Sequence, residues 1–413
     1  MNRREAFNIP LGQPTDEQLL IINEKIDQFK NSKTNSINIG RAYVPSDIYY
    51  SKFLWDYKVG QEQCRYATKF LNNSKRELVF ALTDVASPNG WTFSCGEFDV
   101  VLITSGFFTQ LESNIERIFH IFYNGDLSDF VGKDNFKEEF FSHFKENPFQ
   151  YLNELKYLIR HLSIGHIIGH EFGHLASGHF GFATEAPDDQ KISPASKWDG
   201  IKKTDILSQT NEIEADAHAA LWIDSLLKEL INPTHTEMLT WLKSDPCRIT
   251  FIFSLSSLLW YATLGASKFS VEDLLVAKTH PPTSFRAKVI FDSAVTKNIQ
   301  EDQKNESRHK NFALEALFLV SRNEALKHIM DLSNKSDETS KKTLKYLEGL
   351  SRLELINKFL VEMGLSMLNE DHSEEVKKYL ERIFEFWNTN RKIANPHARW
   401  KPEARVKWGI KES

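Results

Sequence analysis

Two histidines and a glutamate stand out in the run His170-Glu171-Phe172-Gly173-His174. Residues four apart lie on one face of an α-helix, so the two imidazoles can bind one Zn²⁺. A bound metal lowers the pKa of its water, and Glu171 beside it can take the proton and pass it to the leaving amine of a peptide bond. The run therefore predicts a zinc-dependent peptidase with Glu171 as general base.

A catalytic zinc also needs a third protein ligand. The best candidate lies in the acidic run 211–218, where Glu212 and Asp216 are again four residues apart. Glu212 could ligate the metal, and Asp216 could accept a hydrogen bond from the far nitrogen of a ligand histidine, which fixes its tautomer. Alone, the run would read as a solvated helix face. Glu214 is expected to point elsewhere, and His218 is expected to be structural.

A third segment, 279–286 (THPPTSFR), contains a histidine followed by two prolines. The prolines impose a rigid, extended turn, which suits a side chain that must be held in place. His280 and Arg286 could stabilise the oxyanion of a tetrahedral intermediate. Alone, the segment fits a surface histidine in the turn before a helix.

Neighbouring histidines leave an alternative open. His166 lies four residues before His170, so these two form a rival pair, although no glutamate is placed beside them as Glu171 is beside 170 and 174. His161 and His179 are expected not to be ligands.

Hydrophobic spacing indicates the elements that must position these residues. Helical patterns cover 151–178, ending at Gly178, and then 205–231 and 249–266. Buried strands are expected at 77–84 and 98–104, with a short β-prone stretch at 91–95.

Two glycines within the first of these helices are informative. Gly169 and Gly173 each cost about 1 kcal/mol of helix propensity relative to alanine. Glycines beside ligands indicate that another backbone or helix approaches closely.

The predicted fold class is α+β: a mostly helical, zincin-like peptidase with a small mixed sheet and an α-helical C-terminal region. We expect an N-terminal segment at 1–60 and a peptidase domain at 61–299 with an insertion at about 124–150. A helical region with a basic tail follows at 300–413. The insertion or this helical region is the expected gate of the site.

Composition narrows the partners. The 413 residues include 51 Lys and Arg against 56 Asp and Glu, a formal net charge of −5, whereas a nucleic-acid binder would be basic. Cys64, Cys95 and Cys247 are far apart, so neither a disulfide framework nor a cysteine-based zinc site is readable, and a reducing compartment is expected.

No apolar segment follows the basic residues of the N-terminus, so no secretory signal is expected. The best membrane candidate, 249–266, is uncharged but contains five serines and threonines, and it is shorter than the about 20 apolar residues of a spanning helix. We predict a buried core helix and a cytoplasmic protein without a membrane partner.

Taken together, the order HExxH, ExxAD and THPP with a following arginine resembles the HtpX and CAAX-prenyl-protease type of gluzincin metallopeptidases. Asn89-Gly90-Trp91 and the run 100–108 (VVLITSGFF) resemble that family's edge strand and the strand that follows it. The run 212–223 (EIEADAHAALWI) resembles more closely the phage-exclusion Lit peptidases, which also carry a Thr-His-Pro segment.

This resemblance covers about residues 75–290 and implies a zinc cofactor and a set of roles. It implies ligation by His170, His174 and Glu212, a general base at Glu171, a supporting role for Asp216, and oxyanion or substrate contact by His280. Asn89, Gly90 and Trp91 correspond to the substrate-binding strand, although the family's usual Asn-Ala pair is Asn-Gly here. HtpX-type enzymes also span membranes, which this chain is not expected to do.

The expected function is a soluble zinc endopeptidase that binds its substrate as an added strand beside 90–95. The Lit resemblance implies an intracellular protein substrate, such as a translation factor, and a role in phage defence. Two alternatives stay open: a regulatory or binding protein with a structural or vestigial zinc site, and an aminopeptidase-like hydrolase. Mn²⁺, Co²⁺ and Fe²⁺ also suit two histidines and a carboxylate, with zinc the default.

Overall fold

The computed structural model describes residues 12–31, 39–45, 51–68, 76–125, 135–179, 203–231, 236–265, 283–335 and 337–348, with residues 381 and 385. The described part is mostly helical with one small mixed sheet, as the predicted α+β class requires.

The chain forms two compact units, each built from separate stretches of sequence. The first unit contains 1–110, 164–223 and 382–413, and the second contains 111–163 and 224–381. The domain boundaries expected after residues 60 and 299 stay predictions. Three helices contribute residues to both units: α4 (Ser105–Asn124), α6 (Pro148–Ser177) and α8 (Lys203–Ile231).

The sheet of the first unit has the strand order β1-β2-β4-β3. Its strands are β1 (Ala42–Tyr43), β2 (Glu77–Thr83), β3 (Gly90–Cys95) and β4 (Phe98–Thr104). β2 and β4 are parallel, and β3 pairs antiparallel with β4, with Gly90 opposite Ile103. The three predicted strands are confirmed to within one residue at each end. β3 therefore lies at an edge of the sheet, where an added strand could pair.

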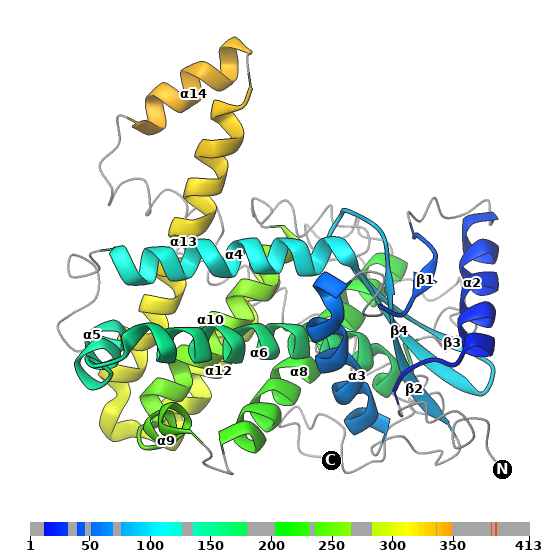
Figure 1. The fold of residues 1–413 in the computed structure, drawn as a ribbon, viewed down its shortest axis with the longest axis horizontal. Helices are drawn as coiled ribbons and strands as arrows, with labels where there is room; N and C mark the ends of the chain where they lie inside the picture. Colours follow the sequence, from blue (N-terminus) through cyan, green and yellow to red (C-terminus); the bar gives the residue numbers. More distant parts are fainter. Residues whose placement is uncertain are drawn as a thin grey trace. The chain divides into compact units, whose positions relative to one another are not determined.

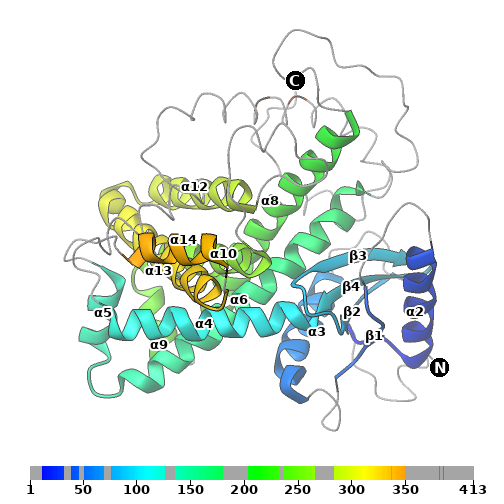
Figure 2. The same ribbon diagram turned by 90° about the horizontal axis from the view of Figure 1, so that it is seen from above.

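Helices cover both faces of this sheet (Figures 1 and 2). Ile22 and Ile26 of α2 (Asp16–Asn31) join a core cluster with Val79 of β2 on one face. On the other face, Tyr57 of α3 (Leu54–Thr68) packs against Phe80 of β2, with the two tilted rings 5.5 Å apart between centroids. Because successive strand side chains alternate between faces, continuous burial along β2 and β4 follows from this two-sided cover. A 3₁₀ turn, η1 (Ser51–Phe53), precedes α3.

The second unit is helical in its described part (Figure 2). Its further elements are α5 (Phe136–His143), α9 (Glu237–Lys243), α10 (Pro246–Leu264), α12 (Thr283–Glu301), η2 (Gln303–Asn305), α13 (Glu306–Ser333) and α14 (Glu338–Glu348). α10 packs along α12 and α13. Phe136 of α5 stacks on Phe251 of α10 at 3.8 Å between centroids. The predicted insertion at 124–150 thus includes a helix that supplies core side chains to this unit.

The segment weighed as a membrane span is α10. It is long and apolar enough to cross a membrane by length and composition, but 83% of its most apolar window is buried inside the protein. The buried positions include its serines and threonines, among them Ser254, Ser256 and Ser257. These observations support the predicted core helix.

Beyond residue 300, α13 and α14 follow the helical spacing predicted from Phe312 onward. The helix expected from Ser373 and the basic tail at 391–413 lie outside the described residues, apart from 381 and 385.

Candidate metal centre

Close approach of two helices creates the site. A Cβ at Gly173 of α6 would lie 2.9 Å from the Cα of Ala215 in α8, and a Cβ at Gly169 would lie 2.9 Å from Cβ of Trp222. Real Cβ atoms do not tolerate such contacts with a backbone, so only glycine allows this spacing. The close approach that the two glycines predicted is confirmed, and it brings the acidic run of α8 against the HExxH turn.

His170, His174 and Glu212 offer one ligand atom each within 4.8 Å of one another. The Nε2 atoms of the two histidines are 3.3 Å apart, and they lie 3.4 and 3.5 Å from the two carboxylate oxygens of Glu212. Ligand atoms about 2 Å from one tetrahedral ion would be separated by similar distances. Among the described residues, His166 is buried but joins no such group, so the rival pairing gains no support.

His170 is held from behind by Asp216. Its Nδ1 lies 2.9 Å from Oδ1 of Asp216, whose side chain is almost fully buried. An ionised carboxylate only accepts hydrogen bonds, so Nδ1 donates the proton and the Nε2 lone pair faces His174 and Glu212. This is the supporting role predicted for Asp216.

His174 is held by a chain that the sequence analysis missed. Its Nδ1 lies 2.8 Å from Nδ1 of His179, and His179 Nε2 lies 3.1 Å from Oε2 of Glu214. Since Glu214 accepts from His179 Nε2–H, Nδ1 of a neutral His179 accepts from His174 Nδ1–H. The Nε2 lone pair of His174 then also faces the cluster. His179 was expected not to be a ligand, and its ring lies against His174, where it can orient that candidate ligand.

Glu214 thus corrects a prediction, because it was expected to point elsewhere on the helix. Its other oxygen accepts from Ser177 Oγ at 2.8 Å, and Ser177 Oγ lies 3.0 Å from Nε2 of His218. Burial opposes ionisation of Glu214, but the hydrogen bonds that it accepts from His179 and Ser177 help to lower its pKa below the ordinary value. His218 is buried, and its predicted structural role stays a prediction.

The turn that follows α6 explains why helical spacing did not predict the contact between His179 and His174. Gly178 has φ 74°, a left-handed conformation that glycine adopts readily, and it ends the helix as predicted. The next residue, His179, is thereby directed back to the buried side of the helix end. Spacing along a helix carries no information about a residue beyond such a turn.

Glu171 lies beside the edge strand. It is buried, and a Cβ at Gly90 would lie 3.0 Å from its Oε1. Asn89 precedes this point, and its Oδ1 accepts from the Gly90 backbone N–H at 2.9 Å. Trp91 is half-buried and packs against the core cluster under α2. The predicted substrate strand and the predicted base are therefore adjacent.

The THPP segment gives a different result. His280 lies outside the described residues, so its predicted role remains a prediction. Arg286 lies on α12 in the second unit, buried, with its guanidinium 5.8 Å from the ring centroids of both Trp260 and Tyr261. These contacts give Arg286 a cation–π attraction to two aromatic rings, and its predicted oxyanion role remains a prediction.

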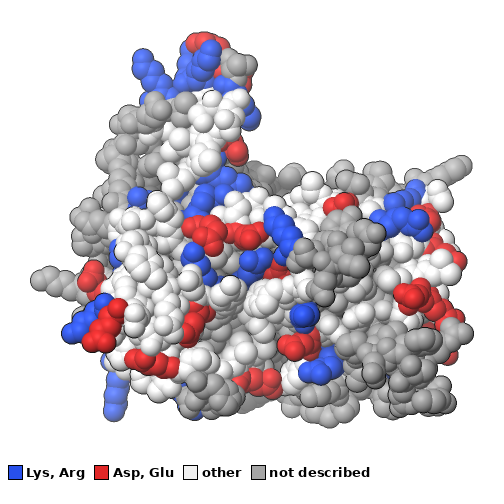
Figure 3. Space-filling view, viewed as in Figure 1, with Lys and Arg blue, Asp and Glu red and all other residues white. Residues whose placement is uncertain are grey.

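Charge on the molecular surface follows the small net charge. On the face shown in Figure 3, Lys and Arg are interspersed with Asp and Glu among the described residues, and regions of one sign are small. No protein-family model, curated protein or solved structure matches the chain. The family resemblance and the zincin-like assignment therefore stay predictions, and the geometry of the site carries the functional argument.

Proposed function

We propose that this protein is a zinc-dependent peptidase that cuts protein substrates. The observation that carries the proposal is the convergence of His170, His174 and Glu212 within 4.8 Å, with Glu171 next in sequence to His170 and beside an edge strand. Two imidazoles and a carboxylate form a donor set that suits Zn²⁺. Both histidine tautomers inferred from Asp216 and His179 turn a lone pair toward the same point.

A bound Zn²⁺ would supply Lewis acidity and lower the pKa of water. The chain's own residues would do the rest. Glu171 would accept a proton from the attacking water and donate it to the departing amine. Its burial beside Gly90 keeps this carboxylate at the strand where a substrate would lie. A structural zinc site needs no such base, which favours the peptidase over the binding-protein alternative.

The edge strand indicates how substrate would bind. β3 pairs with β4 along one side, so an extended peptide could add to its other side through main-chain hydrogen bonds. Gly90 has no side chain to separate such a peptide from Glu171. Recognition through the backbone suits a segment within a protein chain, which favours an endopeptidase over an aminopeptidase-like hydrolase.

The finer assignments belong to the same proposal and depend on the family resemblance. They are a zincin-like fold, a cytoplasmic location, an intracellular protein substrate and a role in phage defence. The largely buried α10 supports a protein without a membrane span.

The test pairs metal content with substrate cleavage. We expect Glu212→Gln to lose one equivalent of zinc per chain. Glu171→Gln should keep the metal, abolish cleavage and retain bound substrate, which mass spectrometry of captured proteins would identify. Glu146→Gln, an exposed glutamate in the turn before α6, is the matched control and should behave as wild type. Undiminished cleavage by Glu171→Gln would overturn the proposal.

A further inference from the structure

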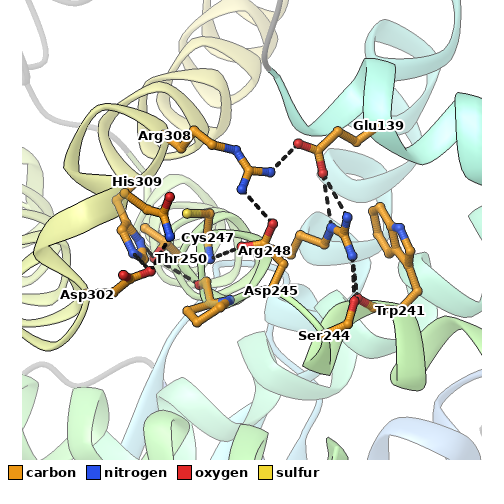
Figure 4. A network of polar contacts seen from close by, with 12 residues as sticks. Glu139, Trp241, Ser244, Asp245, Cys247, Arg248, Thr250, Asp302, Arg308 and His309 are labelled. Carbon is orange, nitrogen blue, oxygen red and sulfur yellow. Dashed lines mark hydrogen bonds and ion pairs between the residues drawn. The ribbon is translucent and has the colours of Figure 1, made fainter.

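A second group of side chains that could hold a metal ion lies in the second unit (Figure 4). Its members come from α10, from α13 and from the residue before η2. Cys247 lies in the first turn of α10, Asp302 precedes η2, and His309 is on α13. The sulfur, a carboxylate oxygen and a ring nitrogen all lie within 4.8 Å of one another. Cys247 is 0% exposed, His309 1%, and the Asp302 side chain 22%.

Hydrogen bonds to Thr250 allow the tautomer of His309 that a metal site needs. Oγ1 of Thr250 accepts from Nδ2 of Asn298 at 3.0 Å, and it lies 2.7 Å from Nδ1 of His309 and 3.4 Å from the carbonyl oxygen of Pro246. When the hydroxyl proton points to Pro246, His309 Nδ1–H donates to Thr250 and the lone pair of the ring lies on Nε2. When the hydroxyl proton points to Nδ1, the ring proton lies on Nε2.

The other nitrogen of His309 faces an acceptor. Nε2 lies 3.3 Å from Oδ2 of Asp302, the oxygen that also accepts from Asn305 at 2.9 Å. A proton on Nε2 would be donated to this carboxylate, whereas a metal ion would bind the lone pair of Nε2 and the carboxylate together. Either a proton on Nε2 or a metal ion therefore satisfies the arrangement.

The surrounding charges leave Asp302 as the group to be neutralised. Arg308 bridges Glu139 and Asp245, lying 2.7 Å from the latter, and Arg248 lies 3.0 Å from Glu139 (Figure 4). These two guanidinium groups balance those two carboxylates. Within the network that the structure describes, the carboxylate of Asp302 has only His309 as an ion-pair partner.

We propose that Cys247, Asp302 and His309 bind a second divalent metal ion of the Zn²⁺ class. A thiolate, an imidazole and a carboxylate form a donor set typical of zinc, and Thr250 orients the imidazole as a carbonyl or carboxylate orients a ligand histidine elsewhere. A Zn²⁺ ion would balance the thiolate and Asp302 with His309 neutral. Partial exposure of Asp302 leaves room for a water as fourth ligand.

The position of these residues indicates a structural role. The metal would join the first turn of α10 to the connection between α12 and α13 and to the start of α13. These helices all belong to the second unit, and α10 packs against both of the others. Among the residues that the structure describes, no glutamate is placed next in sequence to Cys247 or His309 as Glu171 is next to His170. The rival is a hydrogen bond from His309 Nε2–H to Asp302, with Cys247 as a thiol, and it needs no metal.

Metal analysis of the full chain separates the two. We expect two zinc equivalents per chain in wild type, one in His170→Ala/His174→Ala, and one in Cys247→Ala. Cys95→Ala, which removes a buried thiol in the first unit, is the matched control and should keep both. The double histidine variant loaded with Co²⁺ should show a thiolate charge-transfer band that disappears when Cys247→Ala is added.

A double histidine variant that holds no zinc and gives no thiolate band would overturn the proposal. The rival arrangement, in which His309 pairs directly with Asp302, would then hold. If Cys247→Ala does not fold, Asp302→Asn tests the same site, because this partly exposed residue keeps an oxygen that can accept from Asn305. We expect it to weaken zinc binding at the second site at least about 10-fold. Unchanged affinity would also overturn the proposal. Neither result depends on peptidase activity.

Discussion

Gly173 of α6 faces Ala215 of α8 so closely that a Cβ at position 173 would lie 2.9 Å from the Ala215 Cα and from Cβ of His218. The first contact is with backbone, which cannot rotate away. This spacing brings Glu212 within 3.5 Å of His170 and His174, because all three ligands stand within one turn of the crossing.

Gly173→Ala should therefore weaken the site although it improves helix propensity. Alanine gains about 1 kcal/mol of propensity, whereas overpacking against a backbone costs about 1–3 kcal/mol. We expect a net loss of stability and at least about 10-fold weaker zinc binding in metal titrations, as for a disturbed ligand set. Asn153→Ala, at an exposed position on the same helix, gives the propensity gain alone and should leave zinc affinity unchanged.

The two candidate ligand histidines are each oriented by a different side chain, and single substitutions can distinguish the two contributions. Asp216→Asn removes the carboxylate behind His170, and His179→Leu removes the imidazole behind His174. Each should lower zinc affinity about 10–100-fold, the usual effect of losing a group that orients a ligand. Glu214→Gln should act in the same direction but less, since it touches His174 only through His179. If zinc titrations show His179→Leu unchanged, the chain through His179 has no role in binding.

Gly90→Ala should reduce turnover without loss of metal. The added Cβ would lie 2.8 Å from Cδ1 of Ile103 and 3.0 Å from Oε1 of Glu171, so the carboxylate must move. The carboxylate would move by a few tenths of an ångström, so we expect a loss of rate smaller than the about 100-fold that a displacement of about 1 Å can cost. Zinc analysis should give the wild-type value while kcat falls, because Gly90 touches none of the three ligands. Loss of zinc together with activity would show that the edge strand supports the ligands instead.

His218 should make the stability of the metal-free protein depend on pH. Burial, the largest cause, lowers its pKa from 6.5 to about 4, against the attraction of Glu214. Between these values the unfolded chain binds a proton that the folded chain does not, so the free energy of unfolding falls as the pH falls. The full shift corresponds to at most about 3 kcal/mol.

Denaturant unfolding between pH 7 and 4, with a chelator present, compares wild type with His218→Gln. Glutamine can still donate to Ser177 but does not titrate, so the variant should lose less stability on acidification. Parallel curves for the two proteins would show that the pKa of His218 is the same in the folded and unfolded states, so that its burial does not shift it.

The local features of this molecule were readable from the sequence because they depend on neighbouring residues. The spacing of His170 and His174 determines that they share a helix face, and the continuous apolar runs at 77–84 and 98–104 predict buried strands. Gly169 and Gly173 also indicated that another helix lies close, because the lower helix propensity of glycine has to be offset by packing. Glu212 and Asp216 were identified by the same four-residue period.

Other features depended on contacts between residues that are far apart in the chain. His179 reaches His174 only because Gly178 turns the chain, and Glu214 meets it from a different helix. The sequence did not predict the group formed by Cys247, Asp302 and His309. More than fifty residues separate the cysteine from the other two, and only the packing of α10 with α13 brings them together. Periodicity describes one element at a time, whereas convergence of side chains is decided by how elements pack.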